Sequence, residues 1–430
     1  MFTQYLKQGW ALLRQHKFYT AIYVLGTVLA ITMAMVIAIV YHIRSANIAP
    51  ENHRDRMLIV GLSSAVNEES QHTHNWALSY QTLKECYYTL QTPQVVAAGA
   101  NTNSLTYIVG DFYVRISTGE TGQKSFINCT DAAFFQVFSY SFIQGRPYSE
   151  AEFQSGMRQA VLSEKLAYKL FKSRDVLNKT ILVNDMDYTV IGVVKDVPSV
   201  LSYAYAELWI PFTSVPAVRD SKDGGDIVGP FTAFVLADKK ADFPLIKEEV
   251  EQNRKKYNTS LGDWEYRISD DFMLSPFRSE IRKIDYRADF QNIILRFGLL
   301  AFIFLLVPAL NLSGIISSKV QERISELGIR KAFGARRASL MQQVFTENLL
   351  LTLLGGLVGL FLSMSIVYFM RALLLSGYSG VEISLSFFML FNIPVFLYSL
   401  GICVILNVLS SFVPVWNAAR RPIVQAINDK

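Results

Sequence analysis

The sequence lacks the motifs on which nucleotide binding and hydrolytic catalysis usually depend. Its 430 residues contain no Gly-x-x-x-x-Gly-Lys-Ser/Thr loop, so the chain has no P-loop to bind nucleotide phosphates. A Gly-x-Ser-x-Gly elbow is also missing, and only 5 histidines are available to a Ser/His/Asp triad. We therefore expect no catalytic residue, no metal and no cofactor in this chain.

Histidine and cysteine are scarce. His72 and His74 could hold a metal, but the neighbouring sequence offers no cysteine or further histidine, which favours a solvated polar loop. Of the 3 cysteines, Cys403 lies in an apolar run and is expected to pack as a small apolar residue. Cys86 and Cys129 could form a disulfide or stay as free thiols, because spacing alone does not decide between the two.

Charged residues are also few, at 18% of the chain against 51% hydrophobic residues. The net charge of +5 is mild and spread along the chain, which argues against a nucleic-acid partner. The apolar residues gather in four runs, each long enough for the roughly 20 helical residues that cross a hydrocarbon core of about 30 Å. These predicted membrane spans cover residues 19–43, 291–318, 344–370 and 387–414.

The basic residues predict the topology of these spans. They concentrate before the first span, between the second and the third, and after the fourth. By the positive-inside rule both termini are cytoplasmic, and so are the loop 319–343 and the tail 415–430. The long segment 44–290 and the short loop 371–386 then lie outside. Residues 1–18 suit a cytoplasmic amphipathic helix at the membrane interface, with a plain extension of the first span as the alternative.

The long external segment has the pattern of a mixed α/β domain. Strand, helix and strand are expected in turn at Met57–Leu62, Tyr80–Leu90 and Val95–Ala98. The same order recurs at Phe231–Ala237, Phe243–Tyr257 and Trp264–Ile268. We interpret these two units as one βαβ-type subdomain, with a β-rich subdomain inserted at about 101–225. The insert is expected to contain a helix at Ser163–Phe171 and a hairpin of Thr180–Val183 with Tyr188–Val194, joined through Asn184-Asp185-Met186-Asp187.

The predicted spans hold few polar groups that could carry ions. No Asp, Glu, Lys, Arg or His lies in the middle of a span, and such residues mark ion paths and proton relays. An ion-coupled transporter or a hydrophilic pore is therefore not expected. Gly355, Gly356 and Gly359 give a Gly-x-x-x-Gly spacing, which permits close helix approach either within one subunit or between two. Pro308 and Pro394 are expected to kink the second and fourth spans.

The loop after the second predicted span combines charges, apolar residues and two glycines. An apolar helix face continues past the span, and Gly328 and Gly334 then bracket a single helical turn. That turn presents apolar side chains on one side and basic ones on the other, which suits contact with a soluble motor. The alternative is that the loop anchors the chain to lipid phosphates, which would explain its basic residues but not its glycines or its two acids. The residues expected to make the contact are Glu322, Arg323, Glu326, Leu327, Gly328, Ile329, Arg330, Lys331, Ala332, Phe333 and Gly334.

The run from Glu322 to Ala335 resembles the signature of the MacB/FtsX-like family of ABC transporter permeases. Further residues resemble the same family, and the likeness extends over nearly the whole chain. In and after the spans they are Asn311, Glu347, Gly355-Gly356, Pro414, Ala418, Ala419, Arg420 and Pro422. Outside them, Phe134–Phe138, Gly145-Arg146-Pro147, Leu162–Ala167, Leu170-Phe171 and Tyr188–Val194 resemble the MacB-like periplasmic core domain. MacB carries an ATPase on the same chain, whereas this sequence looks like the separate-subunit arrangement of the LolC/LolE permeases.

The resemblance implies a permease subunit that couples ATP hydrolysis in a separate subunit to conformational work in its periplasmic domain, for efflux or for lipoprotein or peptide handling. Its implied partners are two copies of a P-loop ABC ATPase, which would hold ATP and Mg²⁺, and a second or paralogous permease. A periplasmic adaptor, an outer-membrane channel or a lipoprotein is also implied, as is the bacterial inner membrane. The alternatives are a membrane-anchored extracytoplasmic receptor and a regulator of a cell-wall hydrolase without transport.

Overall fold

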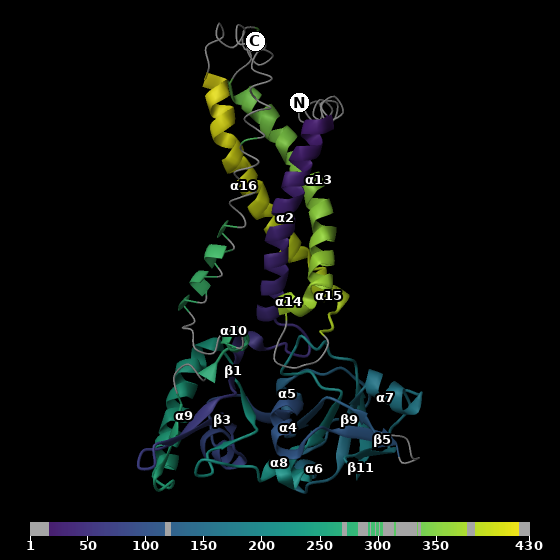
Figure 1. Cartoon of the computed structure of the whole chain (residues 1–430), viewed down its shortest axis with the longest axis vertical. Coiled ribbons are helices and arrows are strands. Elements are labelled where there is room, and N and C mark those ends of the chain that lie inside the picture. The colour runs from purple at the N-terminus through teal and green to yellow at the C-terminus, as the bar shows by residue number, and fades with distance from the viewer. Residues whose placement is uncertain are drawn as a thin grey trace. The chain divides into compact units, whose positions relative to one another are not determined.

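The computed structural model describes residues 17–116, 122–268, 273–282, 337–375 and 383–420, with single residues or short stretches between 291 and 333 (Figure 1). The chain divides into two compact units. The helical unit comprises Met1–Ile43, Ala288–Leu375 and Leu385–Lys430, and the α/β unit comprises Arg44–Arg287 and Ser376–Ser384. The predicted amphipathic helix at 1–18 and the second predicted span fall mostly outside the described residues.

The helical unit contains α2 (Lys17–Ser45), α13 (Arg337–Phe369), α14 (Arg371–Leu375), α15 (Phe387–Leu390) and α16 (Ile393–Arg420). Among the described residues, two helical stretches are long and apolar enough to cross a membrane, Val24–Ser45 and Leu349–Phe369. They coincide with the first and third predicted spans. In the fourth, the apolar helical stretch is shorter and covers Ile393–Ile405.

The fourth predicted span is not one continuous helix. It breaks between α15 and α16 at Phe391 and Asn392, and the Asn392 side-chain oxygen accepts a hydrogen bond from the Val395 N–H at 3.1 Å. Pro394 is the second residue of α16. A proline in the first turn removes no intrahelical hydrogen bond, so the expected kink at Pro394 is wrong and this residue helps to begin the helix instead.

The α/β unit contains two sheets. The larger has twelve strands in the order β16-β1-β14-β4-β7-β12-β9-β11-β10-β5-β6, with β8 paired to β11. Its strands are β1 (Met57–Val60), β4 (Val95–Asn101), β5 (Tyr113–Ile116), β6 (Gln123–Lys124), β7 (Ile127–Thr130), β8 (Phe142–Gly145), β9 (Gln159–Ser163), β10 (Thr180–Val183), β11 (Met186–Val194), β12 (Leu208–Pro211), β14 (Thr232–Leu236) and β16 (Met273–Leu274). The smaller has the order β13-β3-β2-β15, formed by β2 (Ser63–Asn67), β3 (His72–Leu78), β13 (Val228–Gly229) and β15 (Trp264–Arg267).

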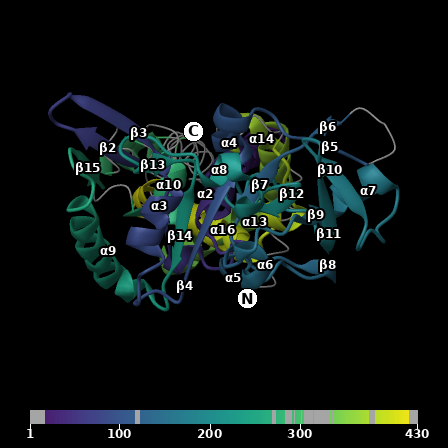
Figure 2. The ribbon, with the colours of Figure 1, turned by 90° about the horizontal axis from the view of Figure 1, so that it is seen from below.

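Short helices connect these strands. The α-helices are α3 (Tyr80–Thr82), α4 (Thr102–Val109), α5 (Phe134–Val137), α6 (Glu150–Gln154), α7 (Glu164–Phe171), α8 (Pro216–Arg219), α9 (Phe243–Asn258) and α10 (Pro276–Arg282). A π-helix, η2 (Leu83–Tyr87), continues α3, and η1 (Arg54–Arg56), η3 (Phe212–Ser214) and η4 (Lys240–Asp242) are 3-10 turns. Figure 2 shows α9 at one end of the unit beside β15 and α7 at the other beside β10 and β11.

The strands and the helix of the first predicted unit are confirmed, but a further strand, β14, lies between the two strands in the sheet. The strands β1 and β4 both pair antiparallel with β14, which lies between them. They therefore run parallel to each other without touching, and the connection between them contains the strands β2 and β3 as well as the expected helical segment α3–η2. The second unit is wrong in its last strand. β15 leaves the large sheet and pairs with β2, matching Trp264 with Asn67 and Arg267 with Ser64, because the β2–β3 hairpin offers it a free edge.

The strands of the segment expected as an insert extend the large sheet. Ala100 of β4 lies opposite Cys129 of β7, so the sheet continues from the first subdomain into the segment at about 101–225. The predicted hairpin is present as β10 and β11, but its turn is only Asn184-Asp185, since Val183 already pairs with Met186. Both turn residues have positive φ, at 45° and 63°, as a two-residue hairpin turn of the right twist requires.

The core of the α/β unit is aromatic. Phe134 and Phe138 of the α5 turn pack at 4.4 Å between ring centroids, and Phe138 lies edge-on to Phe234 of β14 at 5.1 Å. Tyr140 meets Trp209 of β12 at 5.0 Å. Contacts of this kind add stability beyond the area that the rings bury, by about 0.5–1.5 kcal/mol for each pair. The centre of the sheet is therefore closely packed around β12 and β14.

Candidate functional site

The loop predicted to contact an ATPase lies almost entirely outside the described residues. Of the residues from Glu322 to Gly334, the structure describes Phe333, whose side chain is 88% exposed. The coupling role of this loop stays a prediction.

The three glycines of α13 lie against neighbouring helices of the same chain. A Cβ on Gly355 would approach Thr27 Cγ2 of α2 to 3.0 Å, and one on Gly359 would approach Ile31 Cγ2 to 3.0 Å. A Cβ on Gly356 would meet Leu400 Cδ1 of α16 at 2.8 Å. The Gly-x-x-x-Gly face thus packs within one subunit, which favours the first of the two expected uses of these glycines.

Polar contacts also join described helices of this unit. The Thr32 hydroxyl donates to the Gly359 carbonyl at 3.5 Å, on the same glycine face. Asn392 Nδ2 lies 2.9 Å from His42 Nε2, so the residue that begins α16 also contacts the end of α2. Since the Asn392 oxygen is occupied by the Val395 N–H, the amide donates and the His42 nitrogen accepts.

A buried ion pair lies where the chain enters the α/β unit after α2. Arg54 Nε contacts Glu51 Oε2 at 2.5 Å, and these residues are 5% and 1% exposed. Arg54 also donates to the Ala46 carbonyl at 3.3 Å, and Glu51 Oε1 accepts from the Ala204 N–H at 3.2 Å. Because both charges are paired and hydrogen-bonded, this segment is held firmly to the loop that contains Ala204.

That loop, Pro198–Glu207, is here named the junction loop. Its Tyr203 hydroxyl is hydrogen-bonded to the Ser279 hydroxyl of α10, and the Tyr203 ring lies edge-on to Phe234 of β14 at 5.8 Å between centroids. The loop therefore contacts both the segment that follows α2 and the helix that precedes the second predicted span in sequence.

The junction loop leads directly into the middle of the large sheet. Its last residue, Glu207, donates its N–H to the Phe126 carbonyl at 2.7 Å and accepts the Phe126 N–H on its carboxylate at 3.1 Å. β12 follows at Leu208, between β7 and β9, with all four of its residues buried. A change in the position of this loop would act on a central, closely packed strand.

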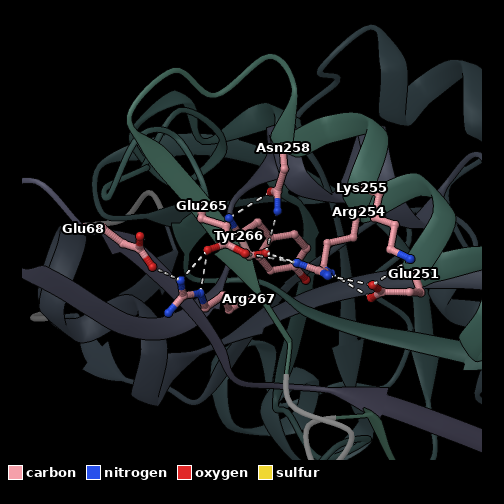
Figure 3. Close-up of polar contacts among 8 residues, drawn as sticks. All are labelled: Glu68, Glu251, Arg254, Lys255, Asn258, Glu265, Tyr266 and Arg267. Carbon is pink, nitrogen blue, oxygen red and sulfur yellow. Dashed lines mark hydrogen bonds and ion pairs between the residues drawn. The ribbon is translucent and has the colours of Figure 1, made fainter.

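A polar network fixes the end of the small sheet against α9 (Figure 3). Asn258 accepts the Tyr266 N–H at 2.9 Å and donates to the Tyr266 carbonyl at 3.2 Å, and Arg254 donates to the same carbonyl at 2.8 Å. Arg254 also pairs with Glu251 at 2.6 Å, which lowers the pKa of the Glu251 carboxyl. These side chains satisfy the backbone at the free edge of β15, which blocks further strand addition there.

The Gly145-Arg146-Pro147 motif has a structural explanation. Gly145 has φ of +70°, and a Cβ there would lie 2.0 Å from the Ile191 carbonyl oxygen, so this position requires glycine. Arg146 forms two hydrogen bonds to the Glu152 carboxylate at 2.6 and 2.7 Å, which holds the pKa of Glu152 well below its usual range. Glu152 in turn completes the capping box of α6 with Ser149.

The carboxyl of Asp131 differs from that of Glu152, because it is buried and, among the described residues, none of its hydrogen-bond donors is an arginine. Asp131 is buried and accepts hydrogen bonds from the Tyr88 hydroxyl at 2.8 Å, the Ala98 N–H at 2.7 Å and the Phe134 N–H at 2.9 Å. Burial raises its pKa to about 7, although these three bonds act in the other direction. Asp131 joins η2, β4 and α5, so it has a structural role within the described contacts.

The histidines and cysteines considered as metal ligands or disulfide partners form neither kind of site among the described residues. Within the described ranges, no group of three or more His, Cys, Asp and Glu side chains is arranged to hold a metal ion. His72 and His74 lie in the strand β3, so the polar loop expected for them is wrong. His74 Nδ1 lies 2.9 Å from Asp223 Oδ2, whereas His72 is exposed. Cys86 and Cys129 are buried free thiols, and burial raises the pKa of Cys86 to about 12. Cys403 is also buried and free.

Comparison with known proteins identifies the family of this chain. Residues 20–253 match the model of the MacB-like periplasmic core domain, and residues 298–423 match the FtsX-like permease C-terminal model. The chain belongs to the MacB/FtsX-like ABC transporter permeases. It is a membrane permease with a periplasmic domain of mixed α/β structure.

Relatives of this permease include a permease and a fused ATP-binding/permease. The uncharacterized ABC transporter permease YknZ of Bacillus subtilis is 29% identical over 54% of this chain and 55% of its own length. The pyoverdine export ATP-binding/permease protein PvdT of Pseudomonas entomophila is 24% identical over 99% of this chain and 59% of its own length. The permease thus spans less than two thirds of these relatives. The crystal structure of the periplasmic region of MacB from Actinobacillus actinomycetemcomitans aligns with 55% of this chain and 95% of its own at 16% identity, with a TM-score of 0.36.

Sequence reasoning did not find the junction loop or its partners in this permease. Glu51 and Arg54 follow the first apolar run and look like ordinary boundary charges. Their only signal is that an acid and a base stand three residues apart beside Pro50. Tyr203 and Ser279 give no signal at all, because a contact between residues so distant in sequence depends on the fold.

Proposed function

We propose that this permease is the membrane subunit of an ABC complex that transmits conformational change from a separate ATPase to the periplasmic domain. The observation that carries the proposal is the junction loop. It binds the segment after α2 through Glu51 and binds α10 through Tyr203, and it continues into the central strand β12. A movement of either segment would therefore reach the middle of the large sheet.

Energy would enter through the loop between the second and third spans. In this proposal two copies of a P-loop ATPase, which hold ATP and Mg²⁺, contact the residues from Glu322 to Gly334. Two ATPases need two docking loops, so the permease works as a homodimer or with a paralogous permease. The apolar composition of the predicted spans supports transmission of movement rather than passage of ions.

The work would be done on the outer side of the bacterial inner membrane. Four spans would place both termini in the cytoplasm and the α/β unit in the periplasm, by the distribution of basic residues. A relative named for pyoverdine export supports efflux as that work. A periplasmic adaptor, an outer-membrane channel or a lipoprotein would then complete the complex.

The test is co-purification of the permease with an ABC ATPase from its own cells. Arg330→Glu with Lys331→Glu is expected to remove the ATPase from the purified complex, because it reverses the charge of the proposed contact. The matched control is Arg336→Glu with Arg337→Glu, which makes the same charge change just beyond the turn and is expected to retain the ATPase. If both pairs retain it, the contact with the ATPase lies outside the turn of Arg330 and Lys331. If no P-loop protein accompanies the wild type, a receptor without an ATPase explains the chain better. Equal loss in both pairs would indicate a lipid anchor.

A further inference from the structure

A third segment of the chain is attached to the junction loop, at Ser199. The Ser199 N–H donates to the Ser384 hydroxyl at 2.8 Å, and the Ser384 N–H donates to the Ser199 hydroxyl at 2.8 Å. The two hydroxyl oxygens are 3.3 Å apart. Each serine thus accepts the backbone N–H of the other, and we name this pair the serine clip.

The serine clip joins residues 185 positions apart in sequence. Ser199 is 6% exposed and Ile383, the neighbour of Ser384, is 8% exposed, whereas Ser384 itself is exposed. Two such bonds hold Ser384 to Ser199 more firmly than one would. This segment belongs to the α/β unit, although Leu375 before it and Leu385 after it belong to the helical unit.

The position of Ser384 in sequence gives the serine clip its significance. The residue lies between α14, which follows α13, and α15, which precedes α16. Sequence reasoning treated 371–386 only as a short external loop. Its end is instead bonded to the same loop that holds Glu51 and Ser279.

We propose that the serine clip is a third mechanical connection, through which movement of the third and fourth spans reaches the junction loop and β12. This inference rests on the proposed function. Ser199 and Ser384 are positioning residues that remain bonded throughout the ATP cycle. The first two spans would then act on the periplasmic domain together with the last two.

The experiment uses the whole permease reconstituted with its ATPase in nanodiscs. Amide hydrogen exchange in peptides covering 198–211 is measured with and without ATP and vanadate. In the wild type we expect an ATP-dependent difference in exchange. Ser199→Ala with Ser384→Ala removes both acceptors and is expected to reduce that difference to about half or less, while ATPase association and hydrolysis remain within about twofold of the wild type.

Two controls separate coupling from simple loss of structure. Ser386→Ala changes a serine two positions away whose side chain does not cap α15, and it is expected to leave the ATP-dependent difference intact. Ser199→Thr keeps a hydroxyl acceptor and is expected to restore most of the difference. A full ATP-dependent difference in the double alanine variant would overturn the inference. No difference in the wild type would overturn the proposed function itself.

A cross-link tests whether the serine clip stays closed. Ser199→Cys with Ser384→Cys places two thiols where the hydroxyl oxygens are 3.3 Å apart, and the native Cys86, Cys129 and Cys403 are buried. We expect the oxidised pair to keep the ATP-dependent exchange difference in the strands that follow the loop. If oxidation abolishes the difference and reduction restores it, the serine clip must open during the cycle, and the proposal of a permanent connection is wrong.

Discussion

The contacts inside the helical unit differ in kind from those inside the α/β unit. In the helical unit, glycines of α13 lie close against Thr27 and Ile31 of α2 and against Leu400 of α16. In the α/β unit, buried charges and aromatic rings fix the segments, as at Glu51 with Arg54. Small residues let apolar helices approach in lipid, where burying apolar surface gives little drive, whereas a water-exposed domain can bury rings and paired charges.

The difference has a consequence for how movement could pass through the permease. Contacts between smooth helix faces can slide, because they depend on shape and on few hydrogen bonds. A buried ion pair with several hydrogen bonds has one favourable geometry and resists displacement. The junction loop is attached by contacts of this second kind, which suits a part that must move as one piece with the segments bonded to it.

The largest expected change in folding stability follows from breaking the buried ion pair of Glu51 and Arg54. Glu51→Ala leaves Arg54 buried without its partner, so we expect the free energy of unfolding of the α/β unit to fall by about 3–5 kcal/mol. Urea unfolding of the purified chain followed by tryptophan fluorescence measures this. Glu68→Ala is the control, because Glu68 pairs with Arg267 at an exposed position and should cost no more than about 1 kcal/mol. Equal losses would remove the distinction between the buried and the exposed ion pairs of the α/β unit, and with it the claim that buried charges fix its segments.

The next expected effect is on the pH dependence of folding stability, where two carboxyls of the α/β unit, Asp131 and Glu152, can be compared. The pKa of Asp131 is raised from 3.8 to about 7 in the folded protein, so the folded state binds more protons between these values. Its contribution to stability is complete below pH about 4 and is lost as pH rises towards 7, by at most about 1.4 kcal/mol per pH unit. Asp131→Asn is expected to flatten this part of the profile, measured by urea unfolding at a series of pH values.

Glu152 provides the opposite sign for that measurement. Arg146 lowers the pKa of its carboxyl below the ordinary value, so its contribution is present above the unfolded value of about 4.5 and is lost on acidification. Glu152→Gln should therefore remove a loss of stability at low pH and leave the region between pH 5 and 7 unchanged. If Asp131→Asn gave the same pattern as Glu152→Gln, the assignment of Asp131 as a carboxyl that favours its protonated form would be wrong.

The smallest expected effect is in the helical unit. Gly359→Leu forces side-chain atoms into Ile31 and should cost about 1–3 kcal/mol through the separation of α13 from α2. The midpoint of thermal aggregation in detergent measures it. Gly401→Leu is the matched control in α16, since a Cβ at Gly401 has no neighbouring atom within 4 Å. Dissociation of a dimer by Gly359→Leu with unchanged thermal stability would place the glycine face between subunits instead.

Local patterns predicted the elements of this permease well. The β-branched runs at β1, β4 and β14, and the amphipathic run at α9, each begin and end within a few residues of the expected positions. Ser163, the first residue of the helix expected at Ser163–Phe171, accepts a hydrogen bond from the Leu166 N–H and caps α7. These features depend on neighbours in sequence, which is why periodicity and capping residues reveal them.

Pairing between distant strands was harder to predict. The sequence at Trp264–Arg267 indicates a strand but carries no information on which sheet it joins, and the free edge of β2 decided that question. The break before α16 was also missed, because Asn392 within an apolar run looks like one more polar residue in a span. The predicted contact residues from Glu322 to Gly334 could be selected from sequence because charges, apolar residues and two glycines occur together in one short stretch.

The sequence by itself determined the membrane character of this permease, its external α/β domain and its family, because apolar runs, strand periodicity and short motifs are local properties. Only the tertiary structure decided that Glu51, Tyr203 and Ser199 belong to one hydrogen-bonded junction, and that Gly355 and Gly359 of α13 face α2. These contacts join residues far apart in sequence, and each depends on burial and geometry that the folded chain alone provides.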